Sequence, residues 1–165
     1  MIRPARAGDI PAIHRMITEL AAYERSRHQV SATESDLSTA LLAARPALFA
    51  HVAEEGGQVV GFALWFLSYS TWAGRHGIYL EDLYVKPERR GQGHGRALLA
   101  ELATICVERG YGRLEWAVLD WNSLAIRFYE SLGAVPMGDW TVHRLAGPAL
   151  HALARRRHLS RRVPA

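Results

Sequence analysis

The chain has 165 residues, of which 49% are apolar, and a formal net charge of +4. This length suits one domain with a full hydrophobic core and is too short for two domains of usual size. A single cysteine excludes an internal disulfide, and the longest apolar stretch, Val59 to Leu67, falls far short of the ~20 residues of a membrane helix. The N-terminus also lacks the apolar centre of a signal peptide. We therefore expect a soluble, cytoplasmic protein.

The positive charge is concentrated at the C-terminal end. Five of the 20 basic residues lie beyond Pro148, where no acidic residue is present, so the remaining 15 nearly balance the 16 acidic ones. We expect one domain over residues 1–147 and a basic, partly helical tail over 148–165. A solvated terminus explains this tail, and a nucleic-acid contact is the alternative, without other support in the sequence. The tail arginines are Arg155, Arg156, Arg157, Arg161 and Arg162.

The N-terminal third predicts a short strand and two helices. The strand is expected at residues 2–5. Asp9 is expected to cap a helix that ends near Glu24. The run Thr33 to Asp36 resembles a capping box, so it predicts the start of a second helix, which ends near Ala44.

The middle of the chain predicts a hairpin, a strand and a long helix. Residues 49–54 and 59–69 flank a Glu-Gly-Gly turn and form the arms of the hairpin. The second arm is apolar on both faces, so it is expected in the centre of the sheet. A strand over residues 78–85 follows, and then a helix that begins near Gly95 and ends at Gly110.

The last third predicts a strand at residues 111–119, a helix from Asn122 to Gly133, and final strands within 135–145. Helices come first in the chain, an antiparallel run follows, and strand and helix then alternate. This order predicts an α+β fold, with a mixed, mostly antiparallel central sheet flanked by helices.

A basic, glycine-rich turn, Arg89-Arg90-Gly91-Gln92-Gly93-His94-Gly95, joins the strand that ends at Val85 to the next helix. Glycines spaced by two permit positive φ, so several unhindered N–H groups can point at one anion. The helix N-terminus adds unpaired N–H groups and a positive dipole end. We interpret the turn as a pyrophosphate site, with a glycine-rich surface turn as the alternative. The sequence fits neither a nucleotide P-loop, which needs Lys-Ser/Thr where Arg96-Ala97 stand, nor a dinucleotide fingerprint.

Two carboxylates, Glu81 and Asp82, lie inside an otherwise apolar strand. Strand alternation places them on opposite faces, so at least one points to the buried side or to a cleft unless a β-bulge intervenes. Burying an unpaired carboxylate is costly, and proteins often keep such a group for a function. Catalysis and a structural salt bridge to an arginine both remain open for this pair.

Two further sets of residues are candidates for chemistry. Asn122 and Tyr129 lie two helical turns apart on one side of a predicted helix, although packing alone also explains a tyrosine there. Tyr23 and Glu24, together with tryptophans, can form a cation site, and core packing is the alternative. The histidines form no ligand pair and Cys106 has no CxxC partner, so we expect no metal site. No Gly-x-Ser-x-Gly elbow is present to begin a hydrolase triad.

Together these motifs resemble the spermidine/spermine (diamine) acetyltransferase branch of the GNAT superfamily of N-acetyltransferases. The resemblance covers nearly the whole chain up to about Leu145, in order and with similar spacing. It implies an α/β sandwich of GNAT type, acetyl-CoA as the co-substrate, and a homodimer. The segments that carry it are Ile2 to Ala5 with Asp9, Glu19 to Glu24, Tyr79 to Val85, Arg90 to Gly95, Trp121-Asn122, Phe128-Tyr129 and Gly133-Ala134.

The resemblance also implies which residues bind acetyl-CoA. The backbone that follows Asp82 would pair with the pantetheine arm, the glycine-rich turn would hold the pyrophosphate, and the helix that begins at Asn122 would add further contacts. The cofactor-binding residues implied in this way are Leu83, Tyr84, Val85, Arg90, Gly91, Gln92, Gly93, His94, Gly95, Arg96, Asn122, Ser123, Leu124 and Ala125.

Glu81 matches the family's general base, which also contacts the amine, and Tyr129 matches its general acid. The sequence departs from the polyamine enzymes in the basic residues 25–28 and around 137–142, so a smaller amine fits as well as spermine. We predict direct acetyl transfer from acetyl-CoA to a primary amine of a small diamine-, polyamine- or thialysine-like molecule. Other acceptors (an amino acid, an aminoglycoside or a protein lysine) and a non-catalytic acyl-CoA-binding regulator are the alternatives. The implied amine-binding residues are Tyr23, Glu24, Glu81, Asp82, Glu115, Trp116 and Ala117.

Overall fold

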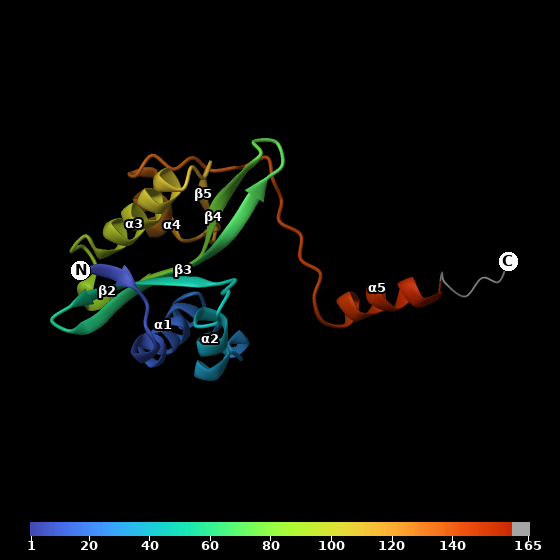
Figure 1. The fold of residues 1–165 in the computed structure, drawn as a ribbon, viewed down its shortest axis with the longest axis horizontal. Helices are drawn as coiled ribbons and strands as arrows, with labels where there is room; N and C mark the ends of the chain where they lie inside the picture. Colours follow the sequence, from blue (N-terminus) through green and yellow to red (C-terminus); the bar gives the residue numbers. More distant parts are fainter. Residues whose placement is uncertain (160–165) are drawn as a thin grey trace. The chain divides into compact units, whose positions relative to one another are not determined.

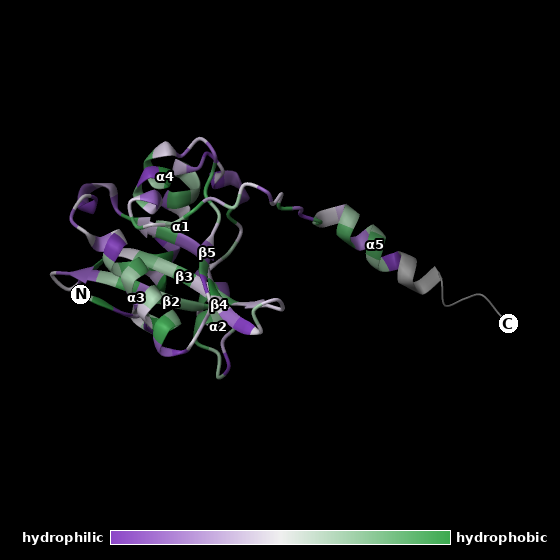
Figure 2. Cartoon of the chain, turned by 90° about the horizontal axis from the view of Figure 1, so that it is seen from above, coloured by the Kyte–Doolittle hydropathy of each residue, from purple (hydrophilic) through white to green (hydrophobic). Residues whose placement is uncertain are grey.

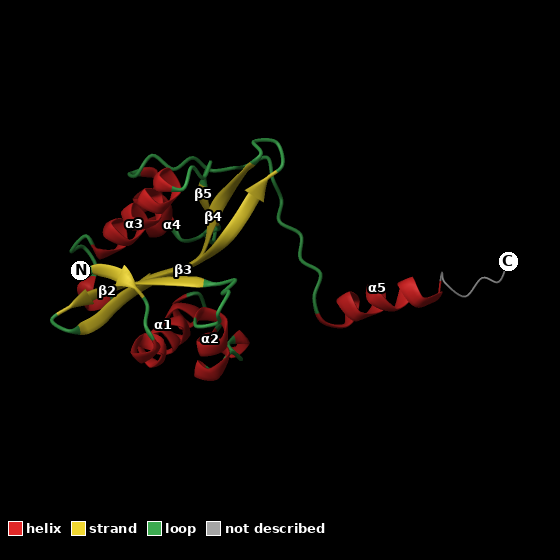
Figure 3. Ribbon diagram, viewed as in Figure 1, coloured by secondary structure: helices red, strands yellow, loops and turns green. Residues whose placement is uncertain are grey.

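The computed structural model of the chain describes residues 1–159. Residues 160–165, which include Arg161 and Arg162 of the basic tail, lie outside the described part. The chain divides into two compact units, Met1–Leu119 and Asp120–Ala165. The first unit is built on a five-stranded sheet with the strand order β1-β2-β3-β4-β5 (Figure 3). Its strands are β1 Ile2–Pro4, β2 Phe49–Glu55, β3 Gln58–Ser70, β4 Arg75–Val85 and β5 Leu114–Trp116.

The pairing of the strands confirms the predicted α+β fold. The strands β1 to β4 pair in antiparallel fashion, and β5 alone is parallel to its neighbour β4. The predicted hairpin is present, with Gly56 and Gly57 at positive φ in its turn. Its long apolar second arm is β3, which occupies the centre of the sheet, as expected for a strand buried on both faces.

Helices cover both faces of the sheet in the first unit. Figure 1 shows α1 (Ile10–Tyr23) and α2 (Glu34–Leu41) on one face and α3 (His94–Glu108) on the other. On the first face, Ile13 and Met16 of α1 pack against Phe62 and Leu64 of β3 in one buried cluster. Short 3₁₀ turns at Ala7–Asp9, Arg27–Gln29 and Pro87–Arg89 complete the unit.

The structure agrees to different degrees with the two caps predicted for the N-terminal helices. The capping box is confirmed, because the Asp36 N–H donates to Thr33 Oγ1 and the Thr33 N–H donates to Asp36 Oδ2. Asp9 is the N-cap residue of α1, as predicted, but its side chain makes no capping hydrogen bond to this helix. Its carboxylate accepts hydrogen bonds from the Arg3 guanidinium, at 2.7 and 2.9 Å, and from the Arg6 N–H. This pairing holds the pKa of Asp9 below its usual value.

The second unit contains two helices, α4 (Ser123–Glu130) and α5 (Gly147–Leu159). The predicted helix start at Asn122 is confirmed, because its Oδ1 accepts the Ala125 N–H at 3.3 Å. Hydrophobic and hydrophilic residues are mixed along α5 (Figure 2), and its Leu150 and Leu153 are exposed.

Two strand predictions near the C-terminal end need correction. Residues 135–145 form no strand, although their apolar pattern suggested one; Val135 and Val142 are 79% and 84% exposed. A strand pattern gains stability only where a partner strand pairs with it. The predicted strand at 111–119 is reduced to Leu114–Trp116, because its pairing with β4 ends at Leu80, where β4 bulges.

Candidate active site

The strand β4 contains a β-bulge at Glu81. Asp82 lies opposite Leu64 of β3 and Leu80 lies opposite Trp65, so Glu81 has no residue opposite it. Residues directly opposite share a face of the sheet, and Leu64 belongs to the buried cluster beneath α1. The bulge therefore shifts the alternation and brings Asp82 to the α1 face, whereas Glu81 is exposed. The sequence pattern left this choice open.

Three carboxylates meet at the bulge. Burial, together with the negative charges of Glu81 and Glu24, raises the pKa of Asp82 to about 6. Glu24 follows the last residue of α1, and burial also raises its pKa. Like charges held together in a partly buried place favour the binding of a cation, or the uptake of a proton by one member.

The strand β4 offers an open edge beside the bulge. Its parallel pairing with β5 joins Ile78 to Leu114, Tyr79 to Glu115 and Leu80 to Trp116, and it ends there. Among the described residues, β5 does not continue alongside 81–85. This edge therefore presents unpaired N–H and C=O groups that an extended ligand can bind.

The glycine-rich turn has the geometry of an anion site. Gly91 and Gly93 have φ values of 75° and 86°, which side-chain-bearing residues rarely adopt. Gly93 is the N-cap of α3, and the first helical hydrogen bond runs from Ala97 N–H to its carbonyl, so the preceding N–H groups lack helical acceptors. The buried Nε2 of His94 has no hydrogen-bond partner among the described residues, and the Glu55 carboxylate lies 3.9 Å from it. A set of N–H donors of this kind fits a diphosphate.

The side chain of Arg90 connects this turn to the carboxylate side of the site. Its Nε donates to the Val85 carbonyl at 2.9 Å. Its guanidinium carbon lies 5.4 Å from the ring centroids of both Tyr23 and Tyr84. Burial and a hydrogen bond to Glu19 raise the pKa of Tyr84 to about 12, so this phenol stays neutral. From the sequence we assigned no role to Glu19, although Glu19 lies in one of the segments that carry the family resemblance.

The first unit brings together expected site residues from three separate segments. The end of α1, the bulged part of β4 and the glycine-rich turn meet through the carboxylates and Arg90. Glu115 and Trp116 lie on β5, where Glu115 forms a 2.7 Å ion pair with Arg113, and Ala117 follows. The remaining expected residues lie in the second unit: Asn122, at the N-cap of α4, and Ser123, Leu124, Ala125 and Tyr129, within it.

Residues 1–159 were searched for a metal site and for a membrane-spanning helix. No group of three histidine, cysteine or carboxylate side chains in this part of the chain could hold a metal ion. No helix here is both long enough and apolar enough to cross a membrane.

The fold and site define a class of α+β domain. It combines a glycine-rich turn with the geometry of an anion site before a helix, an open strand edge beside a β-bulge, and a cluster of carboxylates. The model of the family described as "Acetyltransferase (GNAT) family" matches residues 13–134. The chain belongs to this family and is an acetyltransferase, as its motifs predicted.

Curated relatives and a solved structure support this assignment. Thialysine N-epsilon-acetyltransferase of Bos taurus is 42% identical, over 93% of this chain and 96% of its own. Spermidine/spermine N(1)-acetyltransferase-like protein 1 of Homo sapiens is 34% identical over 84% of this chain, which corresponds to 21% of that longer protein. An integron cassette protein from the mobile metagenome of V. cholerae has the same fold, with a TM-score of 0.78, 27% identity and coverage of 94% and 97% of the two chains.

We expect Gly93→Ala to weaken the binding of CoA by about 5- to 30-fold, because a left-handed alanine costs about 1–2 kcal/mol. Gly74→Ala is the matched control. Gly74 also has a positive φ and open space around its Cα, but it lies in the β3–β4 turn at the other end of β4. Titration calorimetry with CoA measures both variants. Equal affinities in the two would contradict the assignment of the anion site.

Proposed function

We propose that this acetyltransferase transfers the acetyl group of acetyl-CoA directly to a primary amine of a small cationic molecule. The observation that carries the proposal is the cluster of Glu24, Glu81 and Asp82 at the open edge of β4. A primary ammonium group offsets part of the negative charge of these carboxylates and supplies hydrogen-bond donors to them. An acyl-enzyme through Cys106 is not needed, and burial raises the pKa of this thiol, which makes it a poor nucleophile.

The residues of the first unit fit acetyl-CoA as the co-substrate, which supplies an activated thioester when it is bound. The N–H groups from Arg90 to Arg96 would hold its diphosphate. The backbone of Leu83 to Val85 would pair with the amides of its pantetheine arm, and an N–H on this edge would stabilise the oxyanion. We keep Asn122 to Ala125, at the N-terminus of α4, as proposed additional contacts.

A general base is worthwhile in this reaction because an alkylamine with a pKa of about 10.4 is mostly protonated at pH 7. Deprotonation then costs about 4.6 kcal/mol. We propose Glu81 as the general base, directly or through a water molecule. Asp82 is a second candidate, because its pKa of about 6 lies close to the working pH and its carboxylate faces the same cluster.

Tyr129 is the proposed general acid that protonates the departing thiolate. A phenol has a pKa of about 10 and a thiol about 8.5, so the proton transfer is uphill by only about 2 kcal/mol. This is a small part of an enzymatic barrier.

For the acceptor, we propose a diamino acid of the thialysine type, or a small diamine. The match to the curated thialysine acetyltransferase of Bos taurus covers nearly all of both chains. The basic residues Arg25, Arg27 and His28 follow Glu24 directly. A carboxylate at the far end of a diamino acid would find positive charge there, whereas the additional cations of spermine would be repelled.

The experiment is a thiol-release assay with acetyl-CoA against thialysine, lysine, ornithine, putrescine, spermidine, spermine, an aminoglycoside and a lysine peptide. We expect the highest kcat/KM for thialysine or a small diamine, and a lower value for spermine. Turnover of the aminoglycoside or the peptide alone would point to the other acceptors. No turnover with any compound would favour the non-catalytic regulator.

We further propose that the chain works as a homodimer in the cytoplasm. Large apolar side chains between residues 135 and 153 are exposed, and a second copy could cover them. Cys106 is buried and not paired in a disulfide, which suits a reducing compartment. Light scattering of the purified chain measures its mass in solution, and the mass of a monomer would contradict the proposed dimer. We propose no nucleic-acid partner.

A further inference from the structure

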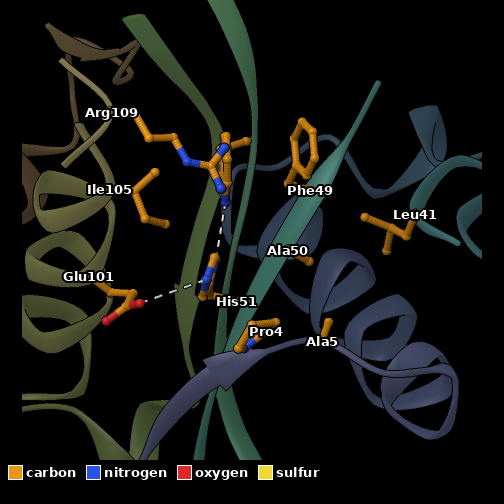
Figure 4. Close-up of a pocket in the computed structure, with 10 residues that line it drawn as sticks. Pro4, Ala5, Leu41, Phe49, Ala50, His51, Glu101, Ile105 and Arg109 are labelled. Carbon is orange, nitrogen blue, oxygen red and sulfur yellow. Dashed lines mark hydrogen bonds and ion pairs between the residues drawn. The ribbon is translucent and has the colours of Figure 1, made fainter. Parts of the chain in front are cut away.

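The first unit contains a cavity of about 400 Å³ between the β1–β2 side of the sheet and the C-terminal half of α3 (Figure 4). No residue of the carboxylate cluster, the open β4 edge or the glycine-rich turn lines it. Its volume lies within the usual range for small-molecule pockets. The acetyl-transfer site therefore does not account for this cavity.

A neutral histidine lies at the centre of the cavity wall. His51 of β2 is 6% exposed, and the Trp65 Nε1–H donates to its Nδ1 at 3.1 Å. This bond places the proton of the neutral ring on Nε2, and burial lowers the pKa of His51, so the ring stays neutral at pH 7. Nε2 lies 4.0 Å from Glu101 Oε1, which is too long for a direct hydrogen bond. The Nε2–H can therefore donate to a ligand.

The helix α3 supplies two opposite charges to the same cavity. Glu101, Ile105 and Arg109 are spaced by four residues, so they lie on one helix face over a rise of about 12 Å. Figure 4 shows Glu101 and Arg109 reaching from this helix toward the strand of His51. Both charges act on the His51 ring, in opposite directions. The polar part of the cavity thus has an anionic end and a cationic end.

The lining of the cavity beside His51 is apolar and aromatic. The rings of Phe49 and Trp65 are stacked, with centroids 4.4 Å apart and planes at 21°. Leu41, from the end of α2, also lines the cavity. A ligand that fills it therefore needs an apolar body as well as charged groups.

We propose that this cavity is a second binding site, for a small zwitterion with an apolar side chain, namely a hydrophobic amino acid. Its carboxylate binds Arg109 and the His51 Nε2–H, its ammonium group binds Glu101, and its side chain packs against Phe49 and Trp65. A ligand with only a positive charge would leave Arg109 without an anionic partner. A ligand with only a negative charge would leave Glu101 without a cationic partner. Each such ligand should therefore bind more weakly than the zwitterion.

The test is titration calorimetry of the purified full chain with L-phenylalanine, L-leucine and L-methionine. We expect at least one of them to bind. For the amino acid that binds best, the analogue without the carboxylate and the analogue without the ammonium group should bind about tenfold or more weakly, because each loses a charged hydrogen bond. No binding by any of the three amino acids, or equal binding by the analogues, would overturn the proposal.

Two variants locate the site. Arg109→Gln removes the carboxylate partner, and Ile105→Phe fills the cavity while the charges remain; each should weaken amino-acid binding about tenfold or more. CoA binding should stay unchanged in both, which also reports that they fold. Arg15→Gln, at an exposed position of α1, is the charge-matched control and should bind as the unchanged chain does. Amino-acid binding that persists in both cavity variants would place it elsewhere and overturn the proposal.

Discussion

Tyr129→Phe should lower kcat by about 100- to 1,000-fold and leave the Kd for acetyl-CoA unchanged. The substitution removes one hydroxyl, and with it the proton that the proposed mechanism gives to the leaving thiolate. The ring remains, so the packing of α4 changes little. Steady-state thiol release measures kcat, and calorimetry measures the binding of CoA.

Tyr69→Phe is the matched control for this experiment. Tyr69 is 53% exposed on β3, where its ring contacts the ring of His76, so the loss of its hydroxyl should leave kcat within about twofold. If Tyr129→Phe turns over as fast as this control, Tyr129 has no part in the chemistry. If it loses CoA affinity together with kcat, its role is in binding.

Asp82→Asn should make the protein more stable at pH 8 and less active. The pKa of this carboxyl is about 6 in the folded chain, against an ordinary value of 3.8. Because the pKa is raised, the folded chain is most stable when Asp82 is protonated, below about pH 4. As the pH rises through 6, ionisation of Asp82 lowers the free energy of unfolding by about 3 kcal/mol. Asparagine avoids this cost, so the gain in the free energy of unfolding should approach that size at pH 8 and vanish near pH 4. Chemical denaturation at the two pH values measures it.

The activity of the unchanged chain should follow the same titration. If the ionised carboxylate is the active form, kcat/KM falls about tenfold for each pH unit below 6, and Asp82→Asn removes most of the activity above it. Glu81→Gln, at an exposed position, should lower turnover without a gain in stability. Full activity of Asp82→Asn at pH 8 would leave Glu81 as the only base candidate at the bulge.

Asp36→Asn is a control of opposite sign for the stability experiment. Hydrogen bonds from the Thr33 side chain and backbone lower the pKa of Asp36. A lowered pKa means that its stabilising effect is present above the ordinary value and is lost as the pH falls. Asp36→Asn should therefore destabilise the chain at pH 8. A gain in stability for both asparagine variants would show that the effect at Asp82 does not come from its buried charge.

Local signals predicted those parts of the structure that depend on neighbours in the chain. The capping box at Thr33, the Gly56-Gly57 hairpin turn and the glycine-rich turn each depend on a few adjacent residues, and all three are present. Predictions failed where tertiary contacts decide the outcome. The Asp9 carboxylate pairs with Arg3 of β1, although Asp9 is the N-cap residue of α1. Residues 135–145 have no strand partner within the described part of the chain.

The sequence by itself determined the α+β architecture, the glycine-rich turn before α3 and the family, because these follow from hydrophobic periodicity, glycine spacing and motif order. Only the tertiary structure decided which carboxylate becomes a partly buried group with a raised pKa. The bulge at Glu81 turns Asp82 toward the α1 face, where Glu24 meets it. Both the face and the pKa depend on contacts between segments far apart in the chain, and a linear pattern does not encode these contacts directly.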